Sequence, residues 1–230
     1  MTSSRWDAQG NIYLVTEEPL TPELVRAVVG GSDGIIEVFR AGDDWVEIGI
    51  WNPDGSRAEM SGNGTRIAAR WLAERTGADH VTVRVGPREV CARMLEGGLI
   101  EQDLGEVWIG EPEEISGIAF VAVDVGNPHA VVEGDPAVLP RVGPLLEVHP
   151  RFPRRTNVQV ARAVSDDVIE ARVWERGAGE TASSGSSAVA IAAVFGISPV
   201  TVRFPGGDLH VRFEDRYAFL TGPAVRVTGV

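Results

Sequence analysis

Hydrophobic and polar residues alternate along most of the chain, in short runs that glycine, proline and aspartate interrupt. Residues 35–39, 45–50 and 81–85 show this pattern clearly. Successive side chains on a strand point to opposite faces of a sheet, so a period of two is typical of half-buried strands. The pattern predicts a protein that is mostly β-structure.

A few segments have the spacing and end signals of helices instead. The predicted helices are Pro22 to Val29 with Thr21 as its cap, Gly64 to Thr76, Ser186 to Phe195, and a short helix between Leu139 and Val148. The second and third each begin just after a Ser-Gly pair and have little polar character on the inward side, and residues 188–194 are apolar all round. A helix that is apolar on every face is normally buried.

The two halves of the sequence resemble each other. Residues 10–17 parallel residues 126–133. In addition, Trp51-Asn52 is followed nine residues later by Ser61-Gly62, just as Trp174-Glu175 is followed nine residues later by Ser184-Gly185. The two matches have similar offsets and the same order along the chain, which indicates an internal duplication.

The duplication predicts an α/β (α+β) fold with two pseudo-symmetric halves. Each half is expected to be a curved, mostly antiparallel sheet wrapped around a central buried helix. The predicted halves are residues 1–116, completed by a strand at about 218–230, and residues 117–217, with the boundary near Ile115 to Ile118.

Composition limits the possible functions. The formal net charge of −12 argues against nucleic acid as a partner, because a phosphate backbone selects basic patches. No apolar run approaches the roughly 18 residues of a membrane-spanning helix, and the N-terminus lacks a signal pattern, so we expect a cytoplasmic protein with no membrane partner. The single cysteine, Cys91, excludes an intramolecular disulfide and is expected to be a small buried residue on a strand. The histidines show no metal-ligand spacing, so no metal site is expected.

Two glycine-rich loops lead into the two buried helices. The N-terminus of a helix presents backbone N–H groups and the positive end of the helix dipole, which together bind a carboxylate or a phosphate. If the halves face each other about a pseudo-twofold axis, both N-termini point into one cleft, with Ser61 and Ser184 on opposite sides of the ligand. The segment 177–182 also fits a loose dinucleotide fingerprint, but Glu180 would repel a pyrophosphate and no βαβ unit precedes the segment.

Five segments in order along the chain carry a resemblance to a known family. They are the glycine-rich segments 52–66 and 175–186, Gly126 to Ala130, Arg155 to Val158, and Leu220 to Ala224, with Gly10 marking the start. Together they closely resemble the signature segments of diaminopimelate epimerase, over nearly the whole chain.

The resemblance implies an enzyme, an isomerase that inverts an amino-acid α-carbon by two-base proton transfer in the cleft between the halves, without pyridoxal phosphate or another cofactor. The expected reaction converts LL- to meso-diaminopimelate. By position in the motifs, the catalytic set is Ser61, Ser184, His129 and Glu175, and the substrate-binding set is Asn11, Asn52, Gly62, Asn63, Asn127, Asn157, Glu175, Arg176, Gly185 and Ser186. The expected partner is a small amino acid, and a homodimer is a family expectation.

Serine replaces the family's cysteine at both acid/base positions, Ser61 and Ser184. Helix amides can bring a thiol of pKa near 8.5 to the thiolate, whereas an alkoxide resembles water near 15.7, and this gap of about seven units corresponds to roughly 10 kcal/mol. Three interpretations remain open: a divergent enzyme whose serine is activated by His129 or Glu175, a catalytically inactive relative that binds an amino acid, or a variant in which both cysteines were replaced.

Two further features bear on the substrate. A proline-type racemase or a dehydratase on the same fold is disfavoured, because Asn157, Glu175 and Arg176 match the diaminopimelate pattern better. The chain is also shorter than expected for the family, so loops that close over the distal end of the substrate are expected to be trimmed.

Overall fold

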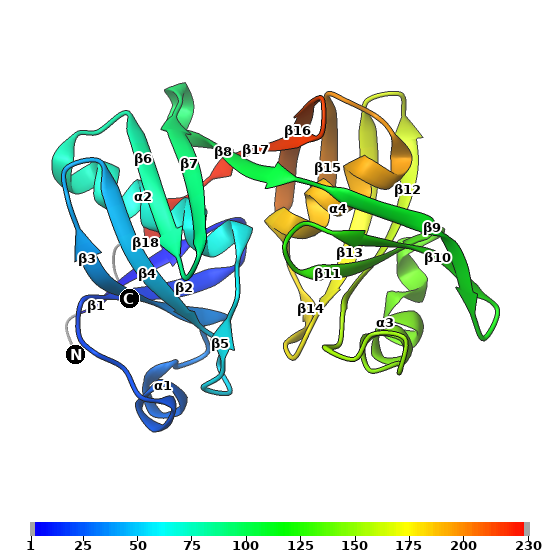
Figure 1. Cartoon of the computed structure of the whole chain (residues 1–230), viewed down its shortest axis with the longest axis horizontal. Helices are drawn as coiled ribbons and strands as arrows, with labels where there is room; N and C mark the ends of the chain where they lie inside the picture. The colour runs from blue at the N-terminus through cyan, green and yellow to red at the C-terminus, as the bar shows by residue number, and fades with distance from the viewer. Residues whose placement is uncertain (1–2, 228–230) are drawn as a thin grey trace. The chain divides into compact units, whose positions relative to one another are not determined.

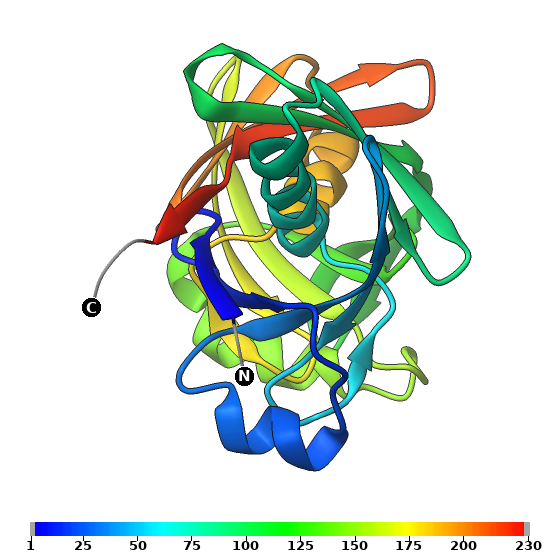
Figure 2. The same ribbon diagram turned by 90° about the vertical axis from the view of Figure 1, so that its left-hand side faces the viewer.

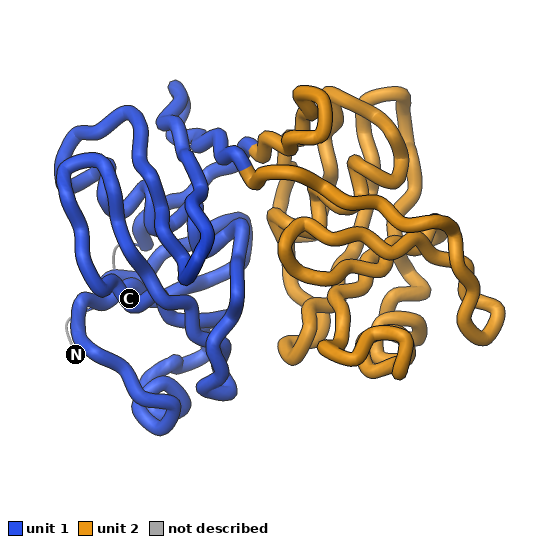
Figure 3. Tube along the Cα trace, viewed as in Figure 1, with its two compact units in different colours: residues 1–103, 221–230 blue, residues 104–220 orange. Residues whose placement is uncertain are grey.

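The computed structural model describes residues 3–227 and separates into two compact units (Figure 3). Unit 1 contains residues 1–103 and 221–230, and unit 2 contains residues 104–220. The chain passes from one unit to the other within two strands, β8 (Leu99–Glu106) and β17 (Tyr217–Pro223). The boundary that the sequence predicted near Ile115 to Ile118 coincides with a turn inside unit 2, and residues 228–230 of the predicted closing strand lie outside the described residues.

Unit 1 contains most of the first half of the chain and a short strand near the C-terminus. Its other elements are β1 (Ser3–Asp7), β2 (Ile12–Thr16), α1 (Pro22–Val28), β3 (Gly34–Ala41), β4 (Trp45–Trp51), β5 (Arg57–Ala58), α2 (Gly62–Thr76), β6 (His80–Val85), β7 (Arg88–Met94), the 3₁₀-helix η1 (Glu96–Gly98) and β18 (Val225–Val227). The strand β18 pairs with β1, so both ends of the described chain belong to this unit.

Unit 2 repeats this order of elements. It contains β9 (Trp108–Ile115), β10 (Ile118–Asp124), β11 (Pro128–Glu133), η2 (Pro136–Val138), α3 (Leu139–Glu147), β12 (Asn157–Ser165), β13 (Val168–Glu175), β14 (Gly179–Thr181), α4 (Gly185–Phe195), β15 (Val200–Phe204) and β16 (Gly207–Glu214).

The strand pairing confirms that the two units share one topology. In unit 1 the pairs β2–β3 and β4–β6 are parallel, and α1 and α2 lie in the connections between them. In unit 2 the parallel pairs are β11–β12 and β13–β15, connected through α3 and α4. Other pairs within the units, such as β3–β4 and β12–β13, are antiparallel. The predicted fold of two similar halves, each mostly antiparallel, is therefore confirmed.

The long helix of each unit lies against the inner face of its own curved sheet (Figures 1 and 2). In α2 the predicted core positions Ile67, Ala68, Trp71 and Leu72 are all buried, and in α4 residues 185–192 are buried. Both helices begin earlier than the sequence predicted, with Ser61 and Ser184 as the N-cap residues. Both end at a glycine in the left-handed conformation, which only glycine adopts without strain.

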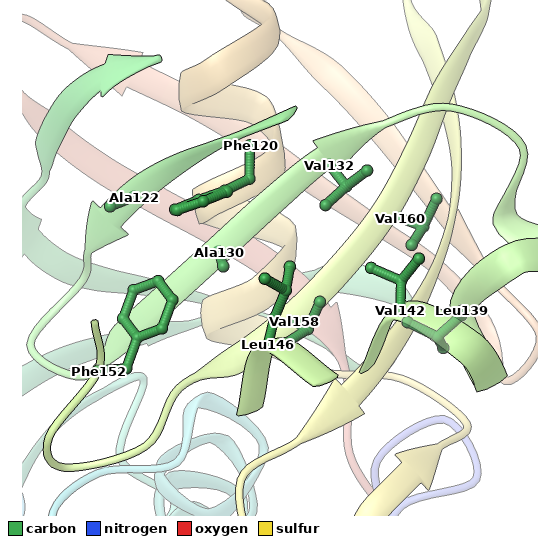
Figure 4. Packing of buried hydrophobic residues seen from close by; sticks show 10 residues of the cluster. All are labelled: Phe120, Ala122, Ala130, Val132, Leu139, Val142, Leu146, Phe152, Val158 and Val160. Carbon is green, nitrogen blue, oxygen red and sulfur yellow. The ribbon is translucent and has the colours of Figure 1, made fainter. Parts of the chain in front are cut away.

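The shorter helix of unit 2, α3, packs on the face of the sheet opposite α4 and forms a separate apolar cluster there (Figure 4). Leu139, Val142 and Leu146 project from one side of the helix toward Val158 and Val160 of β12. Each such side chain contributes about 1.5 to 3 kcal/mol when it is removed from water. The cluster therefore fixes α3 along its length against the sheet.

The prediction for Cys91 is wrong, because this side chain is exposed. In β7 the buried positions are Val90 and Ala92, and the residue between them points to the other face. The sequence pattern located the strand, and the phase of its alternation placed the thiol on the solvent side.

Candidate active site

In unit 1 the candidate acid/base residue caps the helix that contains the predicted binding amides. Ser61 has extended backbone angles, and its Oγ accepts a hydrogen bond from Gly64 N at 3.0 Å. The Tyr13 hydroxyl lies 3.2 Å from the same Oγ. Gly62 and Asn63 follow in the first turn, which contains no acidic residue. This helix end therefore has the positive potential that favours an anion.

A buried arginine that is not among the predicted site residues lies one turn further along α2. Arg66 is fully buried, donates from Nη2 to Asn63 Oδ1 at 2.9 Å and from Nε to Pro223 O at 2.9 Å. Burial lowers the pKa of Arg66 to about 10, which still leaves it charged near neutral pH. An arginine within an otherwise buried helix is the sequence signal that could have identified it, since arginine is almost never fully buried without a partner.

In unit 2 the equivalent helix end has different surroundings. Ser184 is the N-cap residue of α4 and is only 4% exposed, but its side chain makes no cap hydrogen bond. Gly185 and Ser186 follow in the first turn, again without an acidic residue. Asn127, directly before β11, donates from Nδ2 to Ser186 Oγ at 3.5 Å.

A buried polar network connects this helix end to strands β11 and β12. His129 is fully buried; its Nε2 lies 2.9 Å from Asn127 Oδ1, and its Nδ1 lies 3.0 Å from Gln159 Nε2. Gln159 Nε2 also donates to Ser187 Oγ at 2.9 Å. An amide oxygen only accepts and an amide nitrogen only donates, so these partners fit a neutral imidazole with its proton on Nε2.

Burial lowers the pKa of His129 to about 3, and the positive charge of Arg176 acts in the same direction. The imidazole is therefore neutral at physiological pH, and both of its nitrogens already have partners. Gln159 is not among the predicted site residues, although a glutamine within the apolar run of residues 157–161, on the same strand face as Asn157, is a sequence signal for it.

The structure brings three more of the predicted residues together at the ends of β12 and β13. Asn157 Oδ1 accepts a hydrogen bond from Arg176 N at 3.0 Å, and its Nδ2 donates to Pro128 O at 3.0 Å. Glu175 is half-buried, and its Oε1 accepts from Thr181 Oγ1 at 2.6 Å. Asn157, Glu175 and Arg176 therefore form one group, which we call the β12–β13 group.

The last two predicted binding residues lie at strand ends in unit 1. Asn11 is buried directly before β2. Asn52 is half-buried directly after β4 and donates from Nδ2 to Ser56 Oγ at 2.9 Å. Asn11 therefore corresponds to Asn127, which directly precedes β11 in unit 2. Asn52 corresponds to Glu175, at the end of β13.

Within residues 3–227, no three His, Cys, Asp or Glu side chains lie close enough together to hold a metal ion. None of the helices in this part of the chain is long and apolar enough to cross a lipid bilayer.

Comparison with solved structures identifies the fold. A protein from Pseudomonas aeruginosa described as a predicted epimerase superposes with a TM-score of 0.81 at 17% identity, covering 98% of this chain and 96% of its own. A probable proline racemase from Agrobacterium radiobacter gives a TM-score of 0.70 at 13% identity, with 99% and 92% coverage. At these identities the similarity concerns the fold.

Comparison at the sequence level is more specific. A family model described as diaminopimelate epimerase matches residues 121–227. The diaminopimelate epimerase of Synechococcus elongatus is 36% identical, with 97% of this chain and 95% of that protein covered, and the one of Pelotomaculum thermopropionicum is 36% identical, with 86% and 82% covered. The alignment with the Synechococcus protein spans 267 positions, more than the 230 residues of this chain, so that relative has segments that this chain lacks. The chain belongs to the diaminopimelate epimerase family, whose members are isomerases.

Proposed function

We propose that this chain is an amino-acid epimerase of the diaminopimelate type, with Ser61 and Ser184 at the two acid/base positions. The relatives are named for diaminopimelate, and the proposed reaction is the conversion of LL- to meso-diaminopimelate. One residue would remove the α-proton from one face of the α-carbon and the other would deliver a proton to the opposite face. A two-base reaction requires one substrate to reach both serines, and this requirement is part of the proposal.

The observation that carries the proposal is the equivalence of the two helix ends. Ser61 and Ser184 are N-cap residues of the corresponding helices in two units of the same topology. In both, the next two amides belong to the first turn, where no preceding turn supplies an acceptor. Such amides can hold an α-carboxylate and stabilise the negative charge that develops as the α-proton leaves.

Serine limits the rate of the proposed reaction. Forming an alkoxide instead of a thiolate costs roughly 10 kcal/mol, and a helix dipole returns about 1 to 2 kcal/mol. A strong neighbouring base could lower this cost. The contacts of His129 do not supply one, because both ring nitrogens are engaged and burial holds its pKa at about 3.

The same contacts favour a second candidate function, in which the chain binds the amino acid without inverting it. The groups proposed to contact the substrate remain buried and hydrogen-bonded, as in Asn127 and Asn157. The two functions share a ligand and differ in whether the α-proton exchanges with solvent.

The test is α-proton exchange by NMR in D₂O, with LL- and meso-diaminopimelate as substrates. The natural chain is compared with the double variant Ser61→Cys, Ser184→Cys and with a control, Ser3→Cys, Ser165→Cys, whose two thiols replace exposed serines. We expect fast exchange in the double variant alone, because a thiolate forms near neutral pH.

Exchange by the natural chain at a comparable rate would mean that serine acts as a base here, and would contradict the energetic argument. Binding of diaminopimelate without exchange in the natural chain would support the second candidate. Absence of binding and exchange in both the natural chain and the double variant would contradict the proposed function.

A further inference from the structure

Glu147, which the sequence analysis did not single out, connects two loops of unit 2. It is the last residue of α3 and is buried, with 8% of its surface exposed. Its Oε2 accepts from Trp174 Nε1 at 2.7 Å, and its Oε1 accepts from Gly177 N at 2.9 Å. Its backbone carbonyl accepts from Thr156 N at 3.2 Å.

These three bonds surround the β12–β13 group. Thr156 immediately precedes Asn157, while Trp174 and Gly177 stand on either side of Glu175 and Arg176. Glu147 therefore holds both segments from which the proposed substrate contacts project.

Trp174 is held tightly on its other side as well. A Cβ atom added to Gly143 of α3 would lie 2.7 Å from Trp174 Cγ, so the ring packs directly on the helix backbone. Together, the contact of the ring with Gly143 and the hydrogen bond of the indole with Glu147 fix the position of the Trp174 side chain relative to α3.

Unit 1 contains the same kind of contact, made from a different element. Glu37 of β3 is 6% exposed; its Oε2 accepts from Trp51 Nε1 at 2.8 Å, and its Oε1 accepts from Leu20 N at 3.1 Å. Arg57 also donates to Oε2 at 2.8 Å. Trp51 immediately precedes Asn52, as Trp174 precedes Glu175.

The two glutamates are not equivalent in the repeat. The register pairs Tyr13 with Gly34 in unit 1 and His129 with Asn157 in unit 2, so the strand position that corresponds to Glu37 in β12 is Val160. The two carboxylates come from different positions in the repeat, so descent of both units from one duplicated half does not explain why each has one. This indicates that each unit requires the tryptophan before its substrate-contact residue to be fixed.

We propose that Glu147 is a positioning residue that sets the geometry of Asn157, Glu175 and Arg176 for the ligand, and that Glu37 has this role for Asn52. The inference rests on the proposed function for the identity of the ligand. The claim that Glu147 orders the loop from Glu175 to Gly177 does not depend on the proposed function, because it rests only on the hydrogen bonds of Glu147.

The test compares Glu147→Gln with Glu113→Gln in the natural chain and in the Ser61→Cys, Ser184→Cys background. Both carboxylate oxygens of Glu147 accept hydrogen bonds, whereas a glutamine has one acceptor and would leave a donor unmatched. Glu113 is the matched control, because it also belongs to unit 2 and pairs with Arg151 through two 2.7 Å hydrogen bonds on the surface.

The first readout is hydrogen exchange at Gly177 N and Trp174 Nε1, measured without ligand. The second is the dissociation constant for diaminopimelate in the natural chain, together with KM and kcat separately in the cysteine background. We expect Glu147→Gln to speed both local exchanges and to raise the dissociation constant and KM by about tenfold, with a smaller change in kcat, because a charge-assisted bond is lost. Glu113→Gln should change none of these.

Unchanged exchange at Gly177 and Trp174 would overturn the inference whatever the activity is. Faster local exchange with unchanged affinity and KM would also overturn it, since Glu147 would then serve the fold alone. Failure of the proposed function appears differently: the parent chains would not bind diaminopimelate, while the local exchange would still respond to Glu147→Gln, and the ligand-positioning role would fall with the function.

Discussion

The N-terminus of α2 and the N-terminus of α4 begin with the same residue in the same position, yet their surroundings differ. Ser61 is engaged by Gly64 N and by the Tyr13 hydroxyl. Ser184 makes no cap bond, and the position that corresponds to Tyr13 holds the buried His129. One helix end is therefore stabilised by its own serine, and the other is embedded in a network contributed by the sheet.

Under the proposed function, this difference would give the two acid/base positions unlike surroundings. The backbone supplies the same element twice, a helix N-terminus behind a serine, and the side chains from β2 and β11 set its polarity. Stereoinversion needs two groups that act on opposite faces of one carbon, and these groups need not have the same surroundings. Each half can therefore be altered separately.

The largest expected effect comes from changing one serine at a time to cysteine. A single thiolate can remove the α-proton from one face only, so Ser61→Cys should exchange the α-proton of one stereochemistry and Ser184→Cys that of the other. The gain in exchange rate should be at least about a thousandfold, because forming a thiolate avoids most of the roughly 10 kcal/mol that an alkoxide costs. Proton exchange by NMR with LL- and meso-diaminopimelate, the two sides of the proposed reaction, measures both cases.

The two single variants also test whether the N-termini of α2 and α4 act on opposite faces of the α-carbon. The Ser184→Cys thiol has no cap bond to give up, whereas the Ser61→Cys thiol replaces an oxygen that accepts from Gly64 N. If both single variants exchanged the same stereochemistry, the serines would not face opposite sides of the α-carbon, and the two-base assignment would be wrong.

The next effect concerns stability and pH, and it involves unit 2 alone. The pKa of His129 is about 3 in the folded chain and about 6.5 for an ordinary histidine. The unfolded chain therefore binds a proton below pH 6.5 that the folded chain excludes. The contribution of His129 is fully present above pH 6.5 and is lost as the pH falls toward 3, by up to about 1.4 kcal/mol per pH unit.

Urea denaturation between pH 7 and pH 4 measures this loss. Carboxylates titrate in part of the same range, so the informative quantity is the difference between the natural chain and His129→Asn. The variant should be less stable at pH 7 and should show a shallower fall with pH. The exposed His80, changed to glutamine, provides the control. Parallel curves for the natural chain and His129→Asn would contradict the buried neutral imidazole.

The sequence predicted most of the scaffold and a smaller part of its interactions. Hydrophobic periodicity and caps located α1 and α3 to within a residue or two, and the repeated motifs predicted two similar halves. The predicted boundary near Ile115 to Ile118 rested on the Glu-Pro-Glu-Glu run, whereas the chain passes between the compact units inside the strand β8. The exposure of Cys91 was missed because alternation gives two possible phases.

The candidate site shows the same limit. Motif positions predicted the serines and the residues that follow them as site residues, because these lie next to one another in the sequence. An arginine in a buried helix marks Arg66 in the sequence, but its partner Pro223 could not be predicted, and neither could the contact of Glu147 with Trp174, because these partners are distant along the chain. Such pairs become apparent only when the strands and helices are assembled.

The smallest effect is expected from removing each serine hydroxyl in turn. Ser61→Ala deletes the acceptor of the Gly64 N–H bond and should lower the free energy of unfolding by about 1 kcal/mol, whereas Ser184→Ala removes no cap bond and should change it by no more than about 0.3 kcal/mol. Urea denaturation at pH 7 gives both values, and Thr21→Ala, which removes the equivalent cap bond of α1, calibrates the scale. Equal losses at Ser61 and Ser184 would mean that the two helix ends are capped alike. A loss at Ser61 alone would mean that the Ser61 hydroxyl stabilises its helix end and that the Ser184 hydroxyl does not.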